Sequence, residues 1–511
     1  MWFKELEGKP KMKTKFTIKT YLIIALIGGV ISTILIGVLS MVSKDISILG
    51  LSNFSALFLI LNLLAISALI FLITRKAKDP IWTDQLKQKA TLLTDTEERK
   101  TQFLLVSLGG FLLGFYFIFH TLTTTNPLHQ NYFPYFIPWA FWVSAICGQS
   151  LIFIFLWDKK SWTIYIKKNG FALLTLIVIL GAGFTIHSQL RLQNDLKAYS
   201  QDDVIDKEIE EQDIYLVYKE GRNLSQGENP YARAAETEEI RWNSELPTYL
   251  PIIYYGSWLT HEMGFTKIFP WLGVWRRVFL FFNLATAYLL FNTSHHRYKA
   301  TVLGIFAALF WLFNRWTLHV TTIYHFNFIP IFFLVLSLSL LPKRKIVAYL
   351  FFGLSLGLKH NAIFLTPIFL IWAWQESKEK PIQSVLIAGL TIASVPLLAS
   401  LPFIILNPEG FFKSLLISLT RFPETQLGVL SLDAFMGWIG LPAKIPMLVM
   451  LFITYWMAWR GKLKPFTAGL LVMLVFVNFH SILFRHYMAW VIPLLPLTVA
   501  ETLMEHRSQI N

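Results

Sequence analysis

The sequence predicts an all-α polytopic membrane protein with about 14 transmembrane helices. Of its 511 residues, 55% are hydrophobic and 15% are charged, whereas a soluble domain is about 45–50% apolar and about 25% charged. The mean hydropathy is +0.52. The apolar residues form blocks of about 20, the length that a helix needs to cross a hydrocarbon core of about 30 Å. These observations exclude a disordered chain and disfavour a soluble enzyme.

The expected spans follow from the apolar blocks in chain order. They lie at residues 21–43, 53–74, 103–122, 134–156, 170–187, 273–292, 299–317, 323–341, 346–358, 361–375, 383–406, 444–459, 466–483 and 488–503. The blocks at 346–358 and 361–375 are short because Lys359 and His360 interrupt them.

The net charge of +14 is explained by membrane orientation rather than by nucleic-acid binding. Cytoplasmic loops of membrane proteins are enriched in Lys and Arg. With the N-terminus inside, the cytoplasmic segments hold more than half of the 45 basic residues. The short outside connections hold only Lys44, Lys359, Lys413, Arg421, Lys444 and Arg485. We therefore expect an integral multi-pass protein with both termini cytoplasmic. The cell (plasma) membrane is the expected location, and the endoplasmic reticulum would give the same topology.

One long hydrophilic segment, residues 188–270, falls outside the membrane in this topology. It holds 15 acidic and 8 basic residues, and a loop of this length is usually functional or disordered. Apolar residues recur in it at helical spacing: Ile214, Val217, Tyr218, Gly221 and Leu224. The pattern predicts an amphipathic helix that could lie on the membrane surface.

Asp213 begins this predicted helix, and turn residues follow it. Gly227, Asn229 and Pro230 are turn signals, and a segment rich in Tyr and Pro comes next at 246–251. A carboxylate held at the membrane interface is suited to accept a proton from a hydroxyl. On composition alone a solvated acidic face is the stronger interpretation, above all for the acidic residues between 202 and 211.

These motifs resemble those of a known superfamily. Asp213 with Tyr218, then Gly227, Asn229, Pro230 and Tyr231, is similar to the first external loop of GT-C glycosyltransferases, in particular the polyprenyl-phosphate-sugar-dependent mannosyl- and glucosyltransferases. Further along, His325-Phe326-Asn327 and Leu358-Lys359-His360-Asn361 resemble motifs of the dolichyl-phosphate-glucose glucosyltransferases. Arg421 in Leu-Thr-Arg-Phe-Pro and Arg485-His486-Tyr487 also resemble that superfamily. The resemblance covers residues 170–503.

The resemblance implies an inverting transfer of a hexose from a polyprenyl-phosphate donor to an acceptor hydroxyl on the extracytoplasmic face. Asp213 would be the general base. Five residues would bind the donor phosphate: Lys359, Arg485, Arg421, His325 and His486. Many members carry Asp-x-Asp or Asp-Glu in this loop, whereas Gln212 precedes Asp213 here, so the pair Asp202-Asp203 stays an alternative base. Lys359 could instead snorkel to the interface, and Arg421 could anchor a loop.

Two regions are expected: a four-helix membrane region of unknown role at 1–160, and a GT-C-like core at 161–511 with 188–270 as its catalytic loop. The single cysteine, Cys147, excludes an intrachain disulfide and a Cys-based metal site. No metal-ligand set stands out, no cofactor is evident, and a divalent-metal requirement stays open. The expected partners are the polyprenyl-phosphate sugar donor, the lipid bilayer and a glycan, lipid or protein acceptor, with no nucleic acid.

Two other functions compete with this interpretation. A transporter or flippase of a lipid-linked saccharide would favour internal repeats and broken helices near the midplane, and no repeat is evident between the two halves. An oligosaccharide polymerase or ligase would share the large external loop and the lipid carrier. The sequence does not indicate the transferred sugar, the acceptor or the polyprenol.

Overall fold

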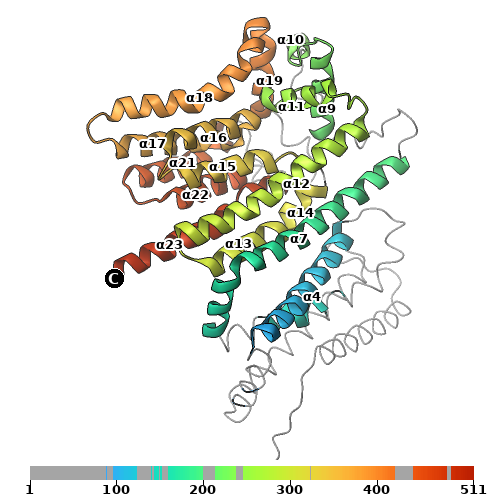
Figure 1. Ribbon diagram of the computed structural model, residues 1–511. Helices are drawn as coiled ribbons and strands as arrows, with labels where there is room; N and C mark the ends of the chain where they lie inside the picture. The colour runs from blue at the N-terminus through green and yellow to red at the C-terminus, as the bar shows by residue number, and fades with distance from the viewer. Residues whose placement is uncertain are drawn as a thin grey trace, which may run out of the picture. The chain divides into compact units, whose positions relative to one another are not determined.

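The computed structural model describes residues 96–123, 159–199, 213–237, 246–322, 324–420, 441–479 and 485–510, with a few positions between 84 and 151. Over these residues the protein is helical and has no strand, as the sequence predicts (Figure 1). The predicted spans 21–43 and 53–74 and most of 134–156 lie outside the described residues.

The chain divides into two compact units, residues 1–168 and 169–511. In the first, α4 (Glu97–Thr123) packs on the start of α7 (Lys159–Tyr199). There the Thr101 and Tyr165 hydroxyls lie 2.7 Å apart. Helix α7 kinks at Asn169, whose φ of −105° and ψ of 17° are not helical. The kink coincides with the boundary between the two units.

In the described part of the chain, four helices are long and apolar enough to cross a membrane. They run over Lys160–Leu190, Ile268–Arg297, Pro381–Leu406 and His486–Met504, and a bent pair, Thr301–Phe313 with Arg315–Thr321, makes a fifth if it forms one span. Four shorter apolar helices lie at Phe328–Leu340, Lys345–Leu358, Lys444–Trp459 and Pro465–Phe479. The protein therefore has four or five span candidates among its described residues, and the expected 14 spans stay a prediction.

Helix α18 (Pro381–Leu406) carries the apolar surface expected of a lipid-facing helix. Leu390, Leu398 and Ile405 are 69–71% exposed, and contiguous exposed apolar surface of this kind marks a membrane or partner contact. On its other face α18 packs against α16 (Lys345–Leu358). A side chain at Gly353 of α16 would collide with the backbone of Ile392, so this glycine permits the close approach of the two helices.

Three helix breaks shape the second unit. Helix α16 ends at Leu358, Lys359 is extended, and a 3₁₀-helix, η3 (His360–Leu365), leads into α17 (Thr366–Glu376). This is the interruption that the sequence predicts. A second break separates α14 (Arg315–Thr322) from α15 (Phe328–Leu340). The third is the 3₁₀-helix η5 (Arg485–Trp490), which precedes α23 (Leu494–Ile510). Helices α14 and η5 are in contact.

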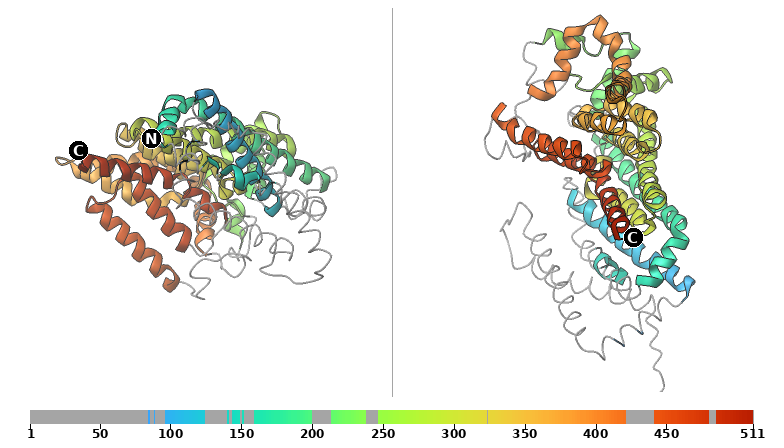
Figure 2. Two further views of the ribbon diagram at one scale, coloured as in Figure 1. Left: turned by 90° about the horizontal axis from the view of Figure 1, so that it is seen from below. Right: turned by 90° about the vertical axis from the view of Figure 1, so that its left-hand side faces the viewer.

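Within residues 188–270 the predicted amphipathic helix forms as α9 (Asp213–Ser225). Its apolar face packs on α11 (Pro251–Glu262), so another helix covers this face. Gly221 lies directly against Ser257 of α11. The short α10 (Ala232–Glu236) packs on α19 (Pro408–Thr420). Helices α9, α10, α11 and α19 gather at one end of this unit (Figures 1 and 2).

Candidate functional site

Four polar side chains from distant parts of the chain meet where the helix breaks face the start of α9. His325 Nε2 lies 2.8 Å from Asp213 Oδ2 and 3.2 Å from Lys359 Nζ. The rings of His325 and His486 lie 4.1 Å apart. Asn327 Nδ2 donates to the backbone carbonyl of His486 at 3.2 Å, which joins two of the breaks. The fold thus brings together four of the six residues predicted for catalysis and donor binding.

The hydrogen bonds of His325 define its tautomer. The backbone N–H of Asn327 donates to His325 Nδ1 at 3.2 Å, so Nδ1 acts as the acceptor. A neutral imidazole then carries its proton on Nε2. This N–H points at Asp213 Oδ2, and it leaves no lone pair at Nε2 for the Lys359 ammonium. His325 is therefore a donor to Asp213, and the ammonium keeps its own donors for another acceptor.

Lys359 is enclosed by aromatic rings. Its side chain is 2% exposed, and Nζ lies 5.1 Å from the centroids of Tyr249 and Phe326 and 5.4 Å from that of Tyr487. Ring faces stabilise a cation, but burial lowers the pKa of Lys359 to about 7 despite the nearby Asp213 carboxylate, so the ammonium holds its proton less firmly than that of a surface lysine. The alternative of a lysine that snorkels to the interface is therefore wrong. Lys359 Nζ lies 3.2 Å from His325 Nε2, which donates to Asp213, so this contact leaves the hydrogen-bond donors of the ammonium available to an anion.

Asp213 is the open member of the cluster, because 40% of its side chain is exposed. Burial raises the pKa of this carboxyl, but the His325 hydrogen bond and the nearby Lys359 and His486 together hold the pKa well below its usual range. The carboxylate is therefore ionised. One oxygen, Oδ2, faces His325, so Oδ1 is the oxygen left to meet a substrate.

Two predicted phosphate ligands are not placed. Arg421 lies outside the described residues, as do the alternative bases Asp202 and Asp203. The backbone of Arg485 begins η5 beside His486, but its side chain is not described. Their proposed roles stay predictions.

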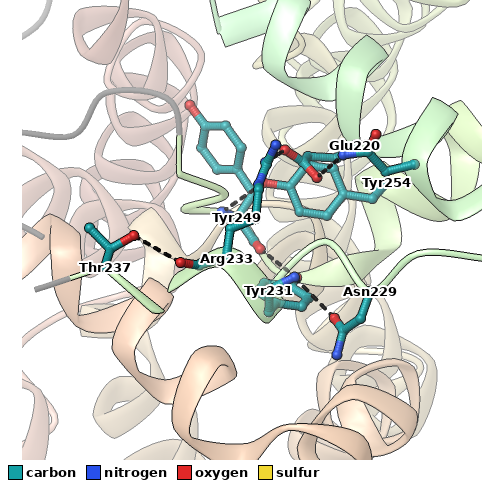
Figure 3. A network of polar contacts seen from close by, with 8 residues as sticks. Glu220, Asn229, Tyr231, Arg233, Thr237, Tyr249 and Tyr254 are labelled. Carbon is teal, nitrogen blue, oxygen red and sulfur yellow. Dashed lines mark hydrogen bonds and ion pairs between the residues drawn. The ribbon is translucent and has the colours of Figure 1, made fainter. Parts of the chain in front are cut away.

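The turn motif serves the local fold between α9 and α11. Gly227 has a φ of +82°, where a side chain would be strained, and Asn229 Oδ1 accepts the backbone N–H of Tyr231 at 3.0 Å. Pro230 is buried, and the Tyr231 hydroxyl donates to the backbone carbonyl of Tyr249 at 2.8 Å. Figure 3 shows this network.

Tyr218, the other residue of the predicted loop motif, also has a structural role. Its hydroxyl donates to the backbone carbonyl of Thr266 at 2.7 Å, and its ring packs 5.4 Å from Trp271.

Sequence reasoning missed two residues near the cluster. Tyr249 contacts Lys359 but lies in a segment that the sequence marks only as rich in Tyr and Pro. Glu220 is fully buried and pairs with Arg233, and burial raises the pKa of Glu220 despite that charge. Helical spacing places Glu220 on the same face of α9 as Leu216 and Leu224, so its burial could be predicted from the sequence. Its pairing with Arg233 could not.

Asp213, His325 and His486 also have the composition of a metal site. One ligand atom from each lies within 4.8 Å of the others, and a mixed His and carboxylate set suits zinc. The sequence shows no such set because the three residues are far apart in the chain. The ammonium 3.2 Å from His325 Nε2 would repel a divalent cation. A hydrogen-bonded Asp–His pair fits the arrangement better.

Comparison with known protein families, curated proteins and solved structures finds no match. An ionised, accessible carboxylate can accept a proton, and an enclosed ammonium beside it can bind an anion.

We expect substitutions of His325 to change the acidity of Asp213. His325→Leu removes a hydrogen bond to a carboxylate, worth about 1.5–3 kcal/mol, so the pKa of Asp213 should rise by about one to two units. Because the base acts when ionised, the acid limb of the pH–rate profile should move to higher pH. His325→Gln places an amide N–H near Nε2 and should restore most of the original profile. The same shift in both variants would contradict a role as donor.

Proposed function

We propose that this protein is a membrane glycosyltransferase that transfers a hexose from a polyprenyl-phosphate donor to an acceptor hydroxyl, with inversion and on the extracytoplasmic face. One observation carries the proposal. The ionised, part-exposed carboxylate of Asp213 is held by His325 next to the enclosed ammonium of Lys359. A base and an anion receptor side by side are what a displacement with a phosphate leaving group requires.

In the proposed reaction the acceptor oxygen attacks the anomeric carbon of the sugar. Asp213 Oδ1 takes the proton of that hydroxyl, a new carbon–oxygen bond forms, and the bond to the phosphate oxygen breaks on the opposite face. The polyprenyl phosphate leaves as an anion beside Lys359. Cations placed in advance lower the free energy of such a transition state because they need no reorganisation.

Donor binding would also make Asp213 a better base. In the free site the pKa of Asp213 is held low by its hydrogen bond and neighbouring positive charge, and a weak base is a poor catalyst. A donor phosphate beside Lys359 adds negative charge close to the carboxylate, and a like charge raises a carboxyl pKa. Deprotonation of the acceptor would therefore be coupled to the presence of the donor.

We also propose that the protein has about 14 spans, with both termini in the cytoplasm, and that it lies in the plasma membrane. The Lys and Arg distribution supports it. In a Cys147→Ser background, cysteines at Ser225 and Met263, both exposed, should react with an impermeant maleimide in intact cells. Labelling that needs permeabilised cells would place α9 and α11 in the cytoplasm and contradict the orientation.

A transporter or flippase of a lipid-linked saccharide is the second candidate. The breaks before α15, after α16 and at η5 favour it, since discontinuous helices form the substrate sites of many transporters. An oligosaccharide polymerase or ligase would use the same carrier but a glycan donor larger than one sugar. Neither the transporter nor the polymerase or ligase requires a part-exposed carboxylate base such as Asp213.

Turnover separates these functions. Purified protein in nanodiscs is offered polyprenyl-phosphate mannose, glucose and arabinose separately, with membrane glycolipids as the acceptor pool. We expect release of polyprenyl phosphate matched by sugar on an acceptor for one donor. Carrier release without transfer would leave hydrolysis alone, and donor translocation in liposomes without turnover would favour the transporter. Parallel reactions with EDTA and with added Zn²⁺ or Mg²⁺ test the metal interpretation of the Asp213 cluster.

A further inference from the structure

The turn motif and the buried Glu220–Arg233 pair take no part in the proposed reaction. Both hold Tyr231, which in turn binds Tyr249 beside the cluster. Tyr231 lies between α9 and α10, and its hydroxyl donates to the backbone carbonyl of Tyr249 at 2.8 Å. The backbone N–H of Tyr249 donates to the hydroxyl of Tyr254 at 3.3 Å. Two buried phenols thus bind both backbone polar groups of Tyr249, which belongs to no helix.

Buried polar contacts hold Tyr231 itself in place. The Glu220 carboxylate of α9 binds the Arg233 guanidinium of α10 and accepts a hydrogen bond from Asn223 at 3.1 Å. Arg233 follows Tyr231 by two residues, so this pair ties together the two helices that flank it (Figure 3). The Tyr231 ring is fully buried and packs 5.0 Å from Phe411. Such satisfied polar networks specify one arrangement of a segment.

The side chain of Tyr249 contacts Lys359 and has the Asp213 carboxylate as an electrostatic neighbour. Its ring centroid lies 5.1 Å from Lys359 Nζ, and its edge packs on Phe326 at 4.8 Å. Burial and the neighbouring Asp213 carboxylate raise the pKa of Tyr249 well above its usual range. The phenol therefore stays protonated and is available as a hydrogen-bond donor to that carboxylate.

We propose that Tyr249 is a positioning residue for the base and the anion receptor, held in place by Tyr231 and Tyr254. Its hydroxyl orients the Asp213 carboxylate, and its ring keeps the Lys359 ammonium at a set distance from that carboxylate. The turn motif would then act through Tyr249. The inference rests on the proposed function of Asp213 and Lys359, and it assigns separate tasks to two parts of one side chain.

Two substitutions separate these tasks. Tyr249→Phe removes the hydroxyl and keeps the ring, so kcat should fall about tenfold, the acid limb should move to higher pH, and the KM for the donor should stay unchanged. Tyr249→Leu also removes the ring, so the affinity for a short-chain prenyl phosphate, measured by calorimetry, should fall about tenfold as well. Tyr231→Phe should also lower kcat, because it removes the hydrogen bond that holds the backbone carbonyl of Tyr249.

Tyr255→Phe is the matched control. Tyr255 lies on α11, and its hydroxyl donates to the Ala399 backbone carbonyl at 3.2 Å, away from the cluster. Normal kcat, pH profile and prenyl-phosphate affinity in both Tyr249 variants would overturn the inference, as would an equal loss in Tyr255→Phe. If the protein transfers no sugar but Tyr249→Leu alone weakens phosphate binding, the proposed function fails and the contact of Tyr249 with the anion receptor is supported. If the protein neither transfers sugar nor binds prenyl phosphate, both proposals are overturned.

Discussion

Asp213→Asn should lower kcat by about 10² to 10⁴ while leaving the fold intact, since this is the range that a general base contributes. The amide keeps the size of the carboxyl and still accepts the His325 N–H, but it has no basic oxygen. A base acts in the transition state, so the loss should appear in kcat and much less in the donor KM. The acid limb of the pH–rate profile should disappear with the carboxylate. Steady-state kinetics in nanodiscs measure both effects.

The matched control for this variant is Glu228→Gln, which removes an exposed carboxylate from the same external segment. It should leave kcat near normal. A collapse of kcat in Asp202→Asn or Asp203→Asn, with near-normal Asp213→Asn, would move the base to that pair. Normal rates in all four variants would refute a mechanism based on a loop carboxylate.

The sequence predicted local structure well where the pattern is local. Helical spacing after Asp213 predicted α9, and Lys359 in an apolar stretch predicted the break after α16. It did not predict that α11 covers the apolar face of α9. The spacing of one helix shows which face is apolar, but not whether lipid or another helix covers it.

The sequence identifies most residues of the cluster but does not predict which of them contact one another. Asp213, His325 and Lys359 each lie in a sequence motif that indicates a site, and the structure brings the three side chains together through His325. Nothing local assigns His325 to Asp213 rather than to a phosphate, because the assignment depends on the Asn327 N–H at the other ring nitrogen. Tyr249 was missed for the same reason. Its role comes from a fold that places it against Lys359.

Lys359→Met should weaken donor binding without destabilising the protein. Removing a charge-assisted contact to phosphate, worth about 1.5–3 kcal/mol, should weaken the affinity for a short-chain prenyl phosphate by about 10- to 100-fold. Stability should not fall, because the apolar methionine side chain of similar volume removes the cost of burying a charge. Asp213 is 40% exposed and keeps its His325 contact, so it is not left as an uncompensated buried charge.

This combination of results separates an anion receptor from a structural lysine. Calorimetry gives the prenyl-phosphate affinity, and thermal unfolding in the same nanodiscs gives the stability. Lys267→Met is the control, because Lys267 is exposed at the N-terminal end of α12 (Ile268–Asn292), and it should change neither quantity. A lower unfolding temperature with unchanged affinity would make Lys359 a structural residue of the aromatic cluster. The phosphate would then have to be bound by Arg485 or Arg421, and the proposed reaction would lose the cation that its leaving group needs beside Asp213.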